Sequence, residues 1–245
     1  MPPNSTFLWQ EGALIKSFFL VRDNHFDEDG ICKILTEPGK YTRVTPSRKI
    51  NENLPDLKAQ IAANAKGSQL IATLLEEYGR STVHFYMSET QRNAELAVRS
   101  FLKQTRAERG PTVLRAEEGM DNGAIMRVAI TIEEDGGATF DFTGTSNEMY
   151  GNFNAPPAIT NSAIIYVLRL LIGTDIPLNQ GCLAPVNVVI PKGCFLNPSA
   201  GAAVCCGNTH TSQRLAELLI KAFDAVAASQ GDSQCLHNAP AHLDS

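Results

Sequence analysis

The chain has 245 residues, of which 43% are hydrophobic and 19% are charged, and its formal net charge is −5. This composition is typical of one large globular domain or two small ones, and it excludes an intrinsically disordered chain. The chain contains no basic block and no recognisable secretory signal, and its longest apolar run, 163–172, is interrupted by Arg169. We therefore expect a soluble protein with no nucleic-acid surface and no membrane span.

The first third of the chain predicts two helices after an extended start. Residues 5–21 predict one or two strands, interrupted at Glu11-Gly12, and residues 27–35 predict a short helix. After a connecting loop at 39–53, Asn53 as an N-cap and Pro55 in the first turn predict a long helix that ends at Gly79. A second helix over 81–103 would complete a helical hairpin.

The first helix of this pair has a polar stripe beside its apolar one, formed by Gln60, Asn64 and Gly67 at helical spacing. Two interpretations stay open. In one, Gly67 allows another element to pack closely and Asn64 bonds a buried backbone group. In the other, the amides of Gln60 and Asn64 lie at the edge of a ligand site.

The middle of the chain changes to the two-residue period of strands. Residues 125–133 and 138–142 alternate around the turn sequence Glu-Asp-Gly-Gly, which predicts a β-hairpin. Residues 157–172 are apolar around most of the helix circumference, so we expect a central helix there.

Residues 185–191, bounded by prolines, predict a short strand, and residues 211–228 predict a last amphipathic helix. Its apolar face consists of Leu215, Leu218, Leu219, Phe223 and Val226. The predicted class is α+β, with a helical hairpin, an antiparallel β-hairpin or sheet, and packed helices.

Three loops, 141–158, 176–182 and 205–214, are dense in Asn, Gly, Ser and Thr and contain no Lys. Asn and Gly tolerate left-handed backbone conformations and form Asx turns, so such loops hold a fixed shape with their donors pointing one way. A surface of uncharged donors suits an amide, a lactam or a carboxylate. If the loops converge, they form a substrate site; if not, they are turn-forming scaffold. The candidate substrate-binding residues are Asn152, Asn154, Asn179, Asn208 and Ser146.

The sequence assigns no catalytic residue. Ser146 is not part of a GxSxG elbow, and no glycine-rich loop for nucleotide phosphates is present. Asp121 and Asp141 flank the hairpin, where a carboxylate is either a cap residue or a general base. Cys206 precedes the last predicted helix and is either a reactive thiol or a buried structural cysteine.

The six cysteines form no CxxC pair, and the five histidines form neither HxH nor HExxH. Scattered cysteines without a secretory signal are typical of a reducing compartment, so we expect a cytoplasmic protein. Cys205 and Cys206 with His210 lack the spacing of a known metal site, and we expect no metal site in this chain.

Six segments occur in a characteristic order and spacing along the chain: 53–67, 120–123, 141–146, 151–156, 176–193 and 207–214. Together they resemble the hydantoinase B/oxoprolinase family, and the likeness is greatest to the C-terminal half of the long eukaryotic 5-oxoprolinases. The resemblance covers about residues 1–231 as a partial family domain, and we expect residues 232–245 to form a divergent, irregular tail.

The resemblance implies ATP-dependent opening of a cyclic amide, 5-oxo-L-proline, to L-glutamate. In that family an A-type half binds ATP and phosphorylates the amide oxygen, which turns a poor leaving group into a good one. The B-type half, which this chain is similar to, receives the activated intermediate. An A-type partner half, a divalent metal and a homo-oligomer are implied for the complete enzyme.

The chain also departs from the family pattern. The family's His and Asp metal motif lies upstream of the segment where this chain starts, so Met1 resembles an internal methionine, and Cys206 stands where the family usually has glycine. Two hypotheses follow: the chain is part of a 5-oxoprolinase-like hydrolase, or it is a truncated, non-catalytic remnant or assembly module.

Overall fold

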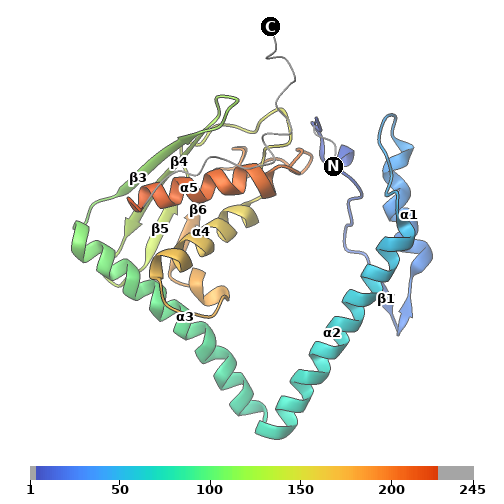
Figure 1. Cartoon of the computed structure of the whole chain (residues 1–245), viewed down its shortest axis with the longest axis horizontal. Coiled ribbons are helices and arrows are strands. Elements are labelled where there is room, and N and C mark those ends of the chain that lie inside the picture. The colour runs from blue at the N-terminus through green and yellow to red at the C-terminus, as the bar shows by residue number, and fades with distance from the viewer. Residues whose placement is uncertain (1–3, 226–245) are drawn as a thin grey trace. The chain divides into compact units, whose positions relative to one another are not determined.

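The chain divides into two compact units, Met1–Met87 and Ser88–Ser245. The computed structural model describes residues 4–225 (Figure 1). The tail at 232–245 and the end of the last predicted helix, 226–228, lie outside the described residues.

The first unit begins with a 3₁₀ turn at Leu8–Gln10, so the prediction of strands over residues 5–21 is largely wrong. The Gln10 side chain accepts hydrogen bonds from the backbone N–H groups of Thr6 (2.7 Å) and Phe7 (3.0 Å), which closes this segment into a turn. A two-stranded antiparallel ladder of β1 (Val21–Arg22) and β2 (His25–Phe26) follows.

Helix α1 (Glu28–Thr36) confirms the predicted short helix. Its N-cap is Asp27, whose carboxylate accepts a hydrogen bond from the Gly30 amide at 2.8 Å. A cap of this kind satisfies one of the amide groups that a helix start leaves without an intrahelical partner. A second 3₁₀ turn, Glu37–Lys40, follows the helix.

Helix α2 (Ile50–Tyr78) ends at Gly79 as predicted, but Asn53 is not its N-cap, because the amides of Glu52 and Asn53 already bond the Lys49 carbonyl. Pro55 therefore lies inside the helix.

No residue of α2 is buried. Gln60 and Asn64 are exposed, and a Cβ at Gly67 would meet no atom within 4 Å, so the close packing proposed there is not seen. The role of these amides at a ligand site stays a prediction.

Helix α3 (Arg80–Arg109) follows directly and continues six residues beyond the predicted end at Lys103. Most of it belongs to the second unit, where Ala94, Val98, Leu102 and Thr105 are buried at helical spacing. In the last turn Arg106 donates to the Ile132 carbonyl at 2.6 Å, which holds the added turns against the sheet.

The second unit is built on a four-stranded sheet in the order β3-β4-β5-β6. The strands are β3 (Leu114–Gly119), β4 (Ile125–Ile132), β5 (Ala138–Asp141) and β6 (Val186–Val189). The predicted hairpin of β4 and β5 is confirmed, but β6 pairs parallel to β5, so the sheet is mixed. A parallel neighbour requires a crossover, and helix α4 supplies it.

The helices α3, α4 (Pro157–Ile172) and α5 (Ser212–Ala222) bury one face of this sheet. Helix α4 has the predicted bounds, while α5 ends at Ala222, earlier than predicted.

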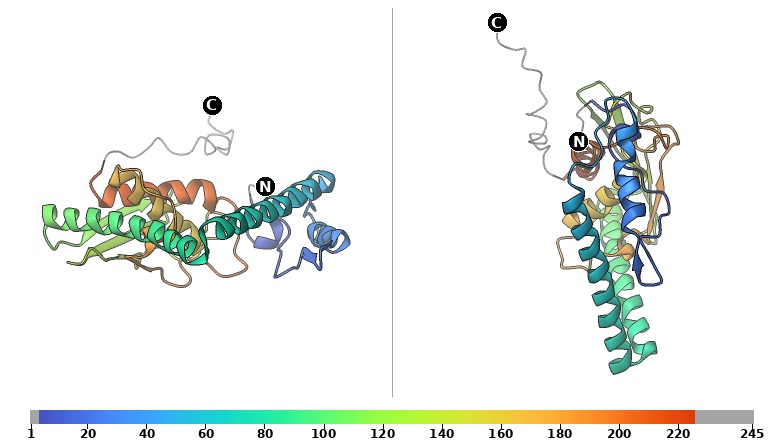
Figure 2. Two further views of the ribbon diagram at one scale, coloured as in Figure 1. Left: turned by 90° about the horizontal axis from the view of Figure 1, so that it is seen from below. Right: turned by 90° about the vertical axis from the view of Figure 1, so that its right-hand side faces the viewer.

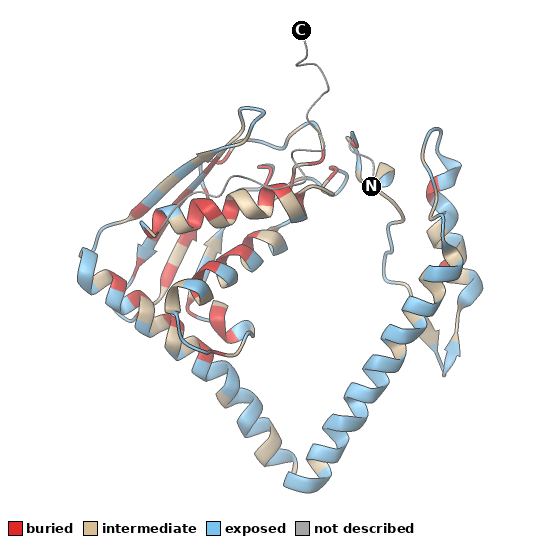
Figure 3. Cartoon of the chain, viewed as in Figure 1, coloured by how far each residue is buried: buried red, intermediate tan, exposed pale blue. Residues whose placement is uncertain are grey.

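Helix α5 lies across β3 and β4 (Figures 1 and 2). Figure 3 shows the buried residues concentrated where these helices meet the sheet. The α+β class is confirmed. The central side chains of this core are Met126, Ile130, Phe140, Ile164, Leu168, Leu215 and Leu218.

Candidate functional site

Two of the three polar loops lie side by side in the second unit. The Cys206 amide donates to the Asn152 carbonyl at 2.9 Å, and the Thr211 hydroxyl donates to the Phe153 carbonyl at 2.5 Å. A Cβ at Gly207 would lie 2.5 Å from the Asn154 carbonyl oxygen, so only glycine allows this approach. The segments 151–154 and 206–211 therefore form one structural feature, which we call the loop pair.

Asn154 holds the first loop of this pair in place. Its side chain is fully buried and makes four hydrogen bonds with backbone groups. The Oδ1 atom accepts from the Met149 amide at 2.8 Å, and Nδ2 donates to the carbonyls of Met149, Gly151 and Ala203 at 2.9–3.1 Å. Because every donor and acceptor of this amide is used within the fold, Asn154 acts by shaping the loop.

Asn152 and Ser146 are also part of the fold around the loop pair. Asn152 is buried, and its carbonyl bonds Cys206. The Ser146 hydroxyl accepts from the Ile125 amide at 2.9 Å, at the start of β4. Its carbonyl accepts from the Phe195 amide, and the Phe195 carbonyl accepts from the amide of Ala155, so one buried residue links Ser146 to the residue that follows the first loop of the pair. 

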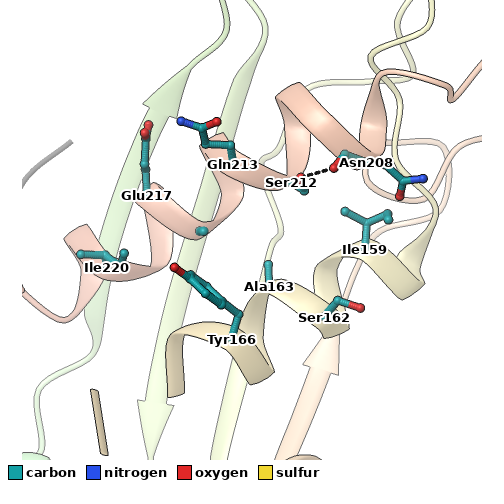
Figure 4. Close-up of a pocket in the computed structure, with 10 residues that line it drawn as sticks. Ile159, Ser162, Ala163, Tyr166, Asn208, Ser212, Gln213, Glu217 and Ile220 are labelled. Atoms are coloured by element: carbon teal, nitrogen blue, oxygen red, sulfur yellow. Dashed lines mark hydrogen bonds between the residues drawn. The ribbon is translucent and has the colours of Figure 1, made fainter. Parts of the chain in front are cut away.

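Asn208 differs because its side chain is exposed. It lines a cavity of about 610 Å³ between α4 and α5, in which Ala163 and Tyr166 of α4 face α5 (Figure 4). The Ser212 hydroxyl donates to the Asn208 carbonyl at 2.7 Å and so fixes the backbone beneath this side chain. The cavity wall carries amide and hydroxyl groups and one carboxylate. Its lining residues are Ile159, Ser162, Ala163, Tyr166, Asn208, Ser212, Gln213, Ala216, Glu217 and Ile220.

Asn179, from the third polar loop, lies at a second cavity of about 710 Å³, which shares Ser162 and Tyr166 with the first. Its Oδ1 accepts from the Gly181 amide at 2.8 Å, and its Nδ2 donates to the Thr90 carbonyl of α3 at 3.2 Å. A Cβ at Gly181 would lie 1.9 Å from the Gln91 carbonyl oxygen, so glycine is required there too. The third loop thus meets α4 on the Tyr166 side and does not join the loop pair.

Tyr166, which is 60% exposed, contributes to both cavities, and sequence reasoning did not select it. The signal was available: Ile159, Ser162 and Tyr166 recur at helical spacing on α4, and two of these three residues are polar in a largely apolar helix. Gln213 and Glu217 follow the same spacing on α5.

The second loop of the pair contains a π-helix, Gly207–Thr211, before α5 begins. Such turns often occur at functional positions. The π-helix of this chain places His210 in the interior, where the residue is 7% exposed. Its Nδ1 atom lies 2.9 Å from the Thr209 hydroxyl, and its ring meets the Phe153 ring edge-on, with the ring centroids 5.4 Å apart. His210 therefore packs the loop pair together from the inside.

An ion-pair network fixes α5 on the sheet beside the cavity. Arg214 bonds Glu217 at 2.6 Å on its own helix and Glu118 of β3 at 2.5 Å, and Lys221 lies 3.4 Å from Glu118. Glu217 is largely buried at the cavity wall. The Arg214 guanidinium holds its carboxylate there through a charge-assisted hydrogen bond. This carboxylate is a charged group that sequence reasoning did not find.

The Hydantoinase B/oxoprolinase family model matches residues 1–242. The chain belongs to this family. It is 49% identical over 252 residues to 5-oxoprolinase 1 of Arabidopsis thaliana, covering 97% of this chain and 20% of that protein. It is 46% identical to the 5-oxoprolinase of Saccharomyces cerevisiae, covering 95% of this chain and 18% of that protein. The chain thus spans about a fifth of the length of these relatives.

The fold of this family member is similar to a crystal structure of the ATP-dependent caprolactamase from Pseudomonas jessenii. The TM-score is 0.71 at 21% sequence identity, and the match covers 90% of this chain and 37% of that chain. At this identity the likeness concerns the fold alone.

Within residues 4–225 of this hydantoinase B/oxoprolinase family member, no three His, Cys, Asp or Glu side chains gather where they could hold a metal ion. The divalent metal implied for the complete enzyme thus has no candidate ligand set in the described part of the chain. The helices of the same part are all too short or too polar to cross a membrane.

Proposed function

We propose that the chain is the B-type part of an ATP-dependent 5-oxoprolinase-like hydrolase and that it forms the substrate-side wall of the site. The observation that carries this proposal is the 49% identity to a 5-oxoprolinase over 97% of the chain. The ATP-binding A-type half, the divalent metal, the homo-oligomer, the cytoplasmic location and the family domain over residues 1–231 belong to the same proposal.

The geometry of the cavity beside Asn208 supports this role. A lactam resists attack by water, and phosphorylation of its carbonyl oxygen, which the A-type half performs, makes that oxygen a leaving group. The remaining task is to hold the activated ring and to stabilise the charge that develops on its oxygen. Fixed neutral donors do this well, since they require no reorganisation during the reaction. The Asn208 amide and the Tyr166 hydroxyl are the neutral donors that the cavity wall offers for this role.

Asn152, Asn154 and Ser146 support the site in this proposal by fixing the loop pair under Asn208, and Asn179 approaches from the other side of Tyr166. The cavity of about 610 Å³ has the volume of a small-molecule site. Glu217, held by Arg214, supplies a carboxylate at its wall.

The test is a chimera. The matching segment of the Saccharomyces cerevisiae 5-oxoprolinase is replaced by this chain, and formation of glutamate and ADP from 5-oxoproline and ATP is measured. We expect ATP-dependent turnover well above that of the enzyme with the segment deleted. A chimera with the melting temperature and assembly of its parent but no turnover would contradict the proposal and favour the non-catalytic remnant or assembly module.

A second assay concerns the chain alone. The purified chain is incubated with ATP, Mg²⁺ or Mn²⁺, and 5-oxoproline. We expect no glutamate, because the A-type half is absent. Glutamate and ADP formed without any other subunit would exclude the hypothesis of a non-catalytic remnant. The same result would show that phosphorylation does not require a separate A-type half.

A further inference from the structure

Two neighbouring thiols lie within reach of each other at the start of the second loop of the pair. The Sγ atoms of Cys205 and Cys206 are 4.0 Å apart, and both residues are half-buried. Cys182 and Cys194, by contrast, are buried in the core. Burial raises the pKa of the Cys194 thiol, which further reduces its reactivity.

The backbone conformation produces this proximity. In an extended chain, successive side chains point to opposite sides, but residues 205 and 206 form a turn before the π-helix. A disulfide needs the two sulfurs about 2 Å closer, which requires rotation of both side chains together with a change in the peptide unit between them. Adjacent α-carbons, at about 3.8 Å, are closer than in ordinary disulfides, so such a bond is readily reduced again.

Cys206 also connects the two loops of the pair. Its amide donates to the Asn152 carbonyl at 2.9 Å, and its carbonyl accepts from the amides of His210 at 3.0 Å and Thr211 at 3.4 Å. A change in the peptide unit between Cys205 and Cys206 therefore acts on the first loop through the Cys206 amide, and a change in the backbone dihedral angles of Cys206 acts on the π-helix through its carbonyl.

We propose that Cys205 and Cys206 form a dithiol modification site, which a small-molecule disulfide such as oxidised glutathione converts reversibly to a vicinal disulfide. One thiolate attacks the oxidant and forms a mixed disulfide, releasing one reduced glutathione. The second thiolate then attacks the bound protein sulfur and releases the other. Two thiol protons pass to the two glutathione thiolates, so the protein pair is oxidised and the glutathione disulfide is reduced. This proposal does not depend on the proposed function.

The experiment treats the full chain with oxidised glutathione, alkylates the remaining thiols and analyses the tryptic peptide 193–214 by mass spectrometry. This peptide contains Cys194, Cys205 and Cys206. We expect it to lose two hydrogen atoms, with fragment ions placing the bond between residues 205 and 206, and a dithiol reductant should restore both thiols. Alkylation of both cysteines after oxidation, or a stable glutathione adduct on the wild-type pair, would overturn the proposal.

Single variants separate the two steps. In Cys205→Ser and Cys206→Ser, the second attack is impossible, so we expect the glutathione adduct to persist on the remaining thiol. The matched control is Cys32→Ser with Cys235→Ser, which removes other exchange partners and should leave the oxidation at 205 and 206 unchanged. Loss of the closed bond in this control would mean that the observed disulfide joins other cysteines.

Two further probes use the wild-type chain. Phenylarsine oxide condenses with two thiols and releases one water molecule, so we expect one phenylarsenic group per chain that resists a monothiol and is removed by a dithiol. Either serine variant should fail to retain it.

Hydrogen exchange should become faster at the amides of Cys206, His210 and Thr211 after oxidation. Unchanged exchange at these amides would show that the bond does not act on the loop pair.

Discussion

The two loops of the pair lie against each other, yet their asparagines have opposite surroundings. Asn154 in the first loop is fully buried, and its amide makes four hydrogen bonds with backbone groups. Asn208 in the second loop is exposed at the wall of a cavity. The same residue type in the same polar pattern thus serves two purposes: a buried amide fixes the shape of the loop, and an exposed amide is available to a ligand.

The largest expected effect on stability comes from Asn154→Ala. The change leaves one amide and up to three carbonyls of a buried loop without their partner, so the free energy of unfolding should fall by roughly 3 kcal/mol or more. Urea denaturation measures it. Asn208→Ala is the matched control and should stay within about 0.5 kcal/mol of wild type, since its side chain is exposed. Equal losses of unfolding free energy in the two variants would mean that the buried amide of Asn154 contributes no more to stability than the exposed amide of Asn208.

Of these two variants, Asn208→Ala should have the larger effect on catalytic activity. In the chimera with the yeast enzyme we expect kcat to fall by about 10- to 100-fold, because one neutral donor is lost from the site. Asn208→Gln, which keeps an amide, should recover part of the loss. Full turnover in Asn208→Ala would mean that the cavity between α4 and α5 does not receive the substrate.

Gly207→Ala tests the contact between the loops. The added methyl group would lie 2.5 Å from the Asn154 carbonyl oxygen, and backbone atoms cannot move aside without cost. We expect a loss of about 2 kcal/mol in the free energy of unfolding. Gly201→Ala is a control in the same region, where a Cβ meets no atom within 4 Å. A stable Gly207→Ala chain would show that the loops can separate.

Thr160 on α4 is the opposite case to Asn154, because its buried polar group is not satisfied within residues 4–225. Its hydroxyl is buried and has no hydrogen-bond partner among the described residues, unlike the satisfied amide of Asn154. Thr160→Val removes this unsatisfied group at nearly equal volume, so we expect a gain of about 1 kcal/mol in the free energy of unfolding. Thr160→Ser keeps the hydroxyl and should show no gain. A loss in Thr160→Val would mean that the hydroxyl is satisfied in solution.

The smallest expected effect concerns Asp135, an exposed Asx residue in the β4–β5 turn. A hydrogen bond from the Gly137 amide, and then the nearby Arg99 guanidinium, lower the pKa of Asp135 below its ordinary value of 3.8. Because the folded-state pKa is the lower one, this carboxylate stabilises the fold above its unfolded pKa, and the contribution disappears as pH falls through the folded value. Urea midpoints of Asp135→Asn and wild type should therefore differ at neutral pH and converge in acid. A difference that persists in acid would exclude this cause.

Local patterns were sufficient to predict several elements of the fold. The bounds of α4, the β4–β5 hairpin and the end of α2 at Gly79 follow from periodicity and from turn residues, which act over a few positions. Strand β3 was missed because Glu118 lies on the same face as Leu114 and Ala116, so a charged residue interrupts the apolar alternation of that face. The extended start and the Asn53 cap were wrong because the Gln10 side chain and the Lys49 carbonyl offer competing local bonds.

The sequence by itself determined the class of the fold, the family and the three polar loops in which a site could lie. Only the tertiary structure decided which loops meet, that the sheet is mixed and that Tyr166 and Glu217 face a cavity. It also decided that the amide of Asn154 is fully hydrogen-bonded within the fold, whereas that of Asn208 is exposed. The physical reason is the range of the contacts: turn and helix signals arise between near neighbours, whereas the partners that bury or expose a side chain, such as Ala203 for Asn154, lie far away along the chain.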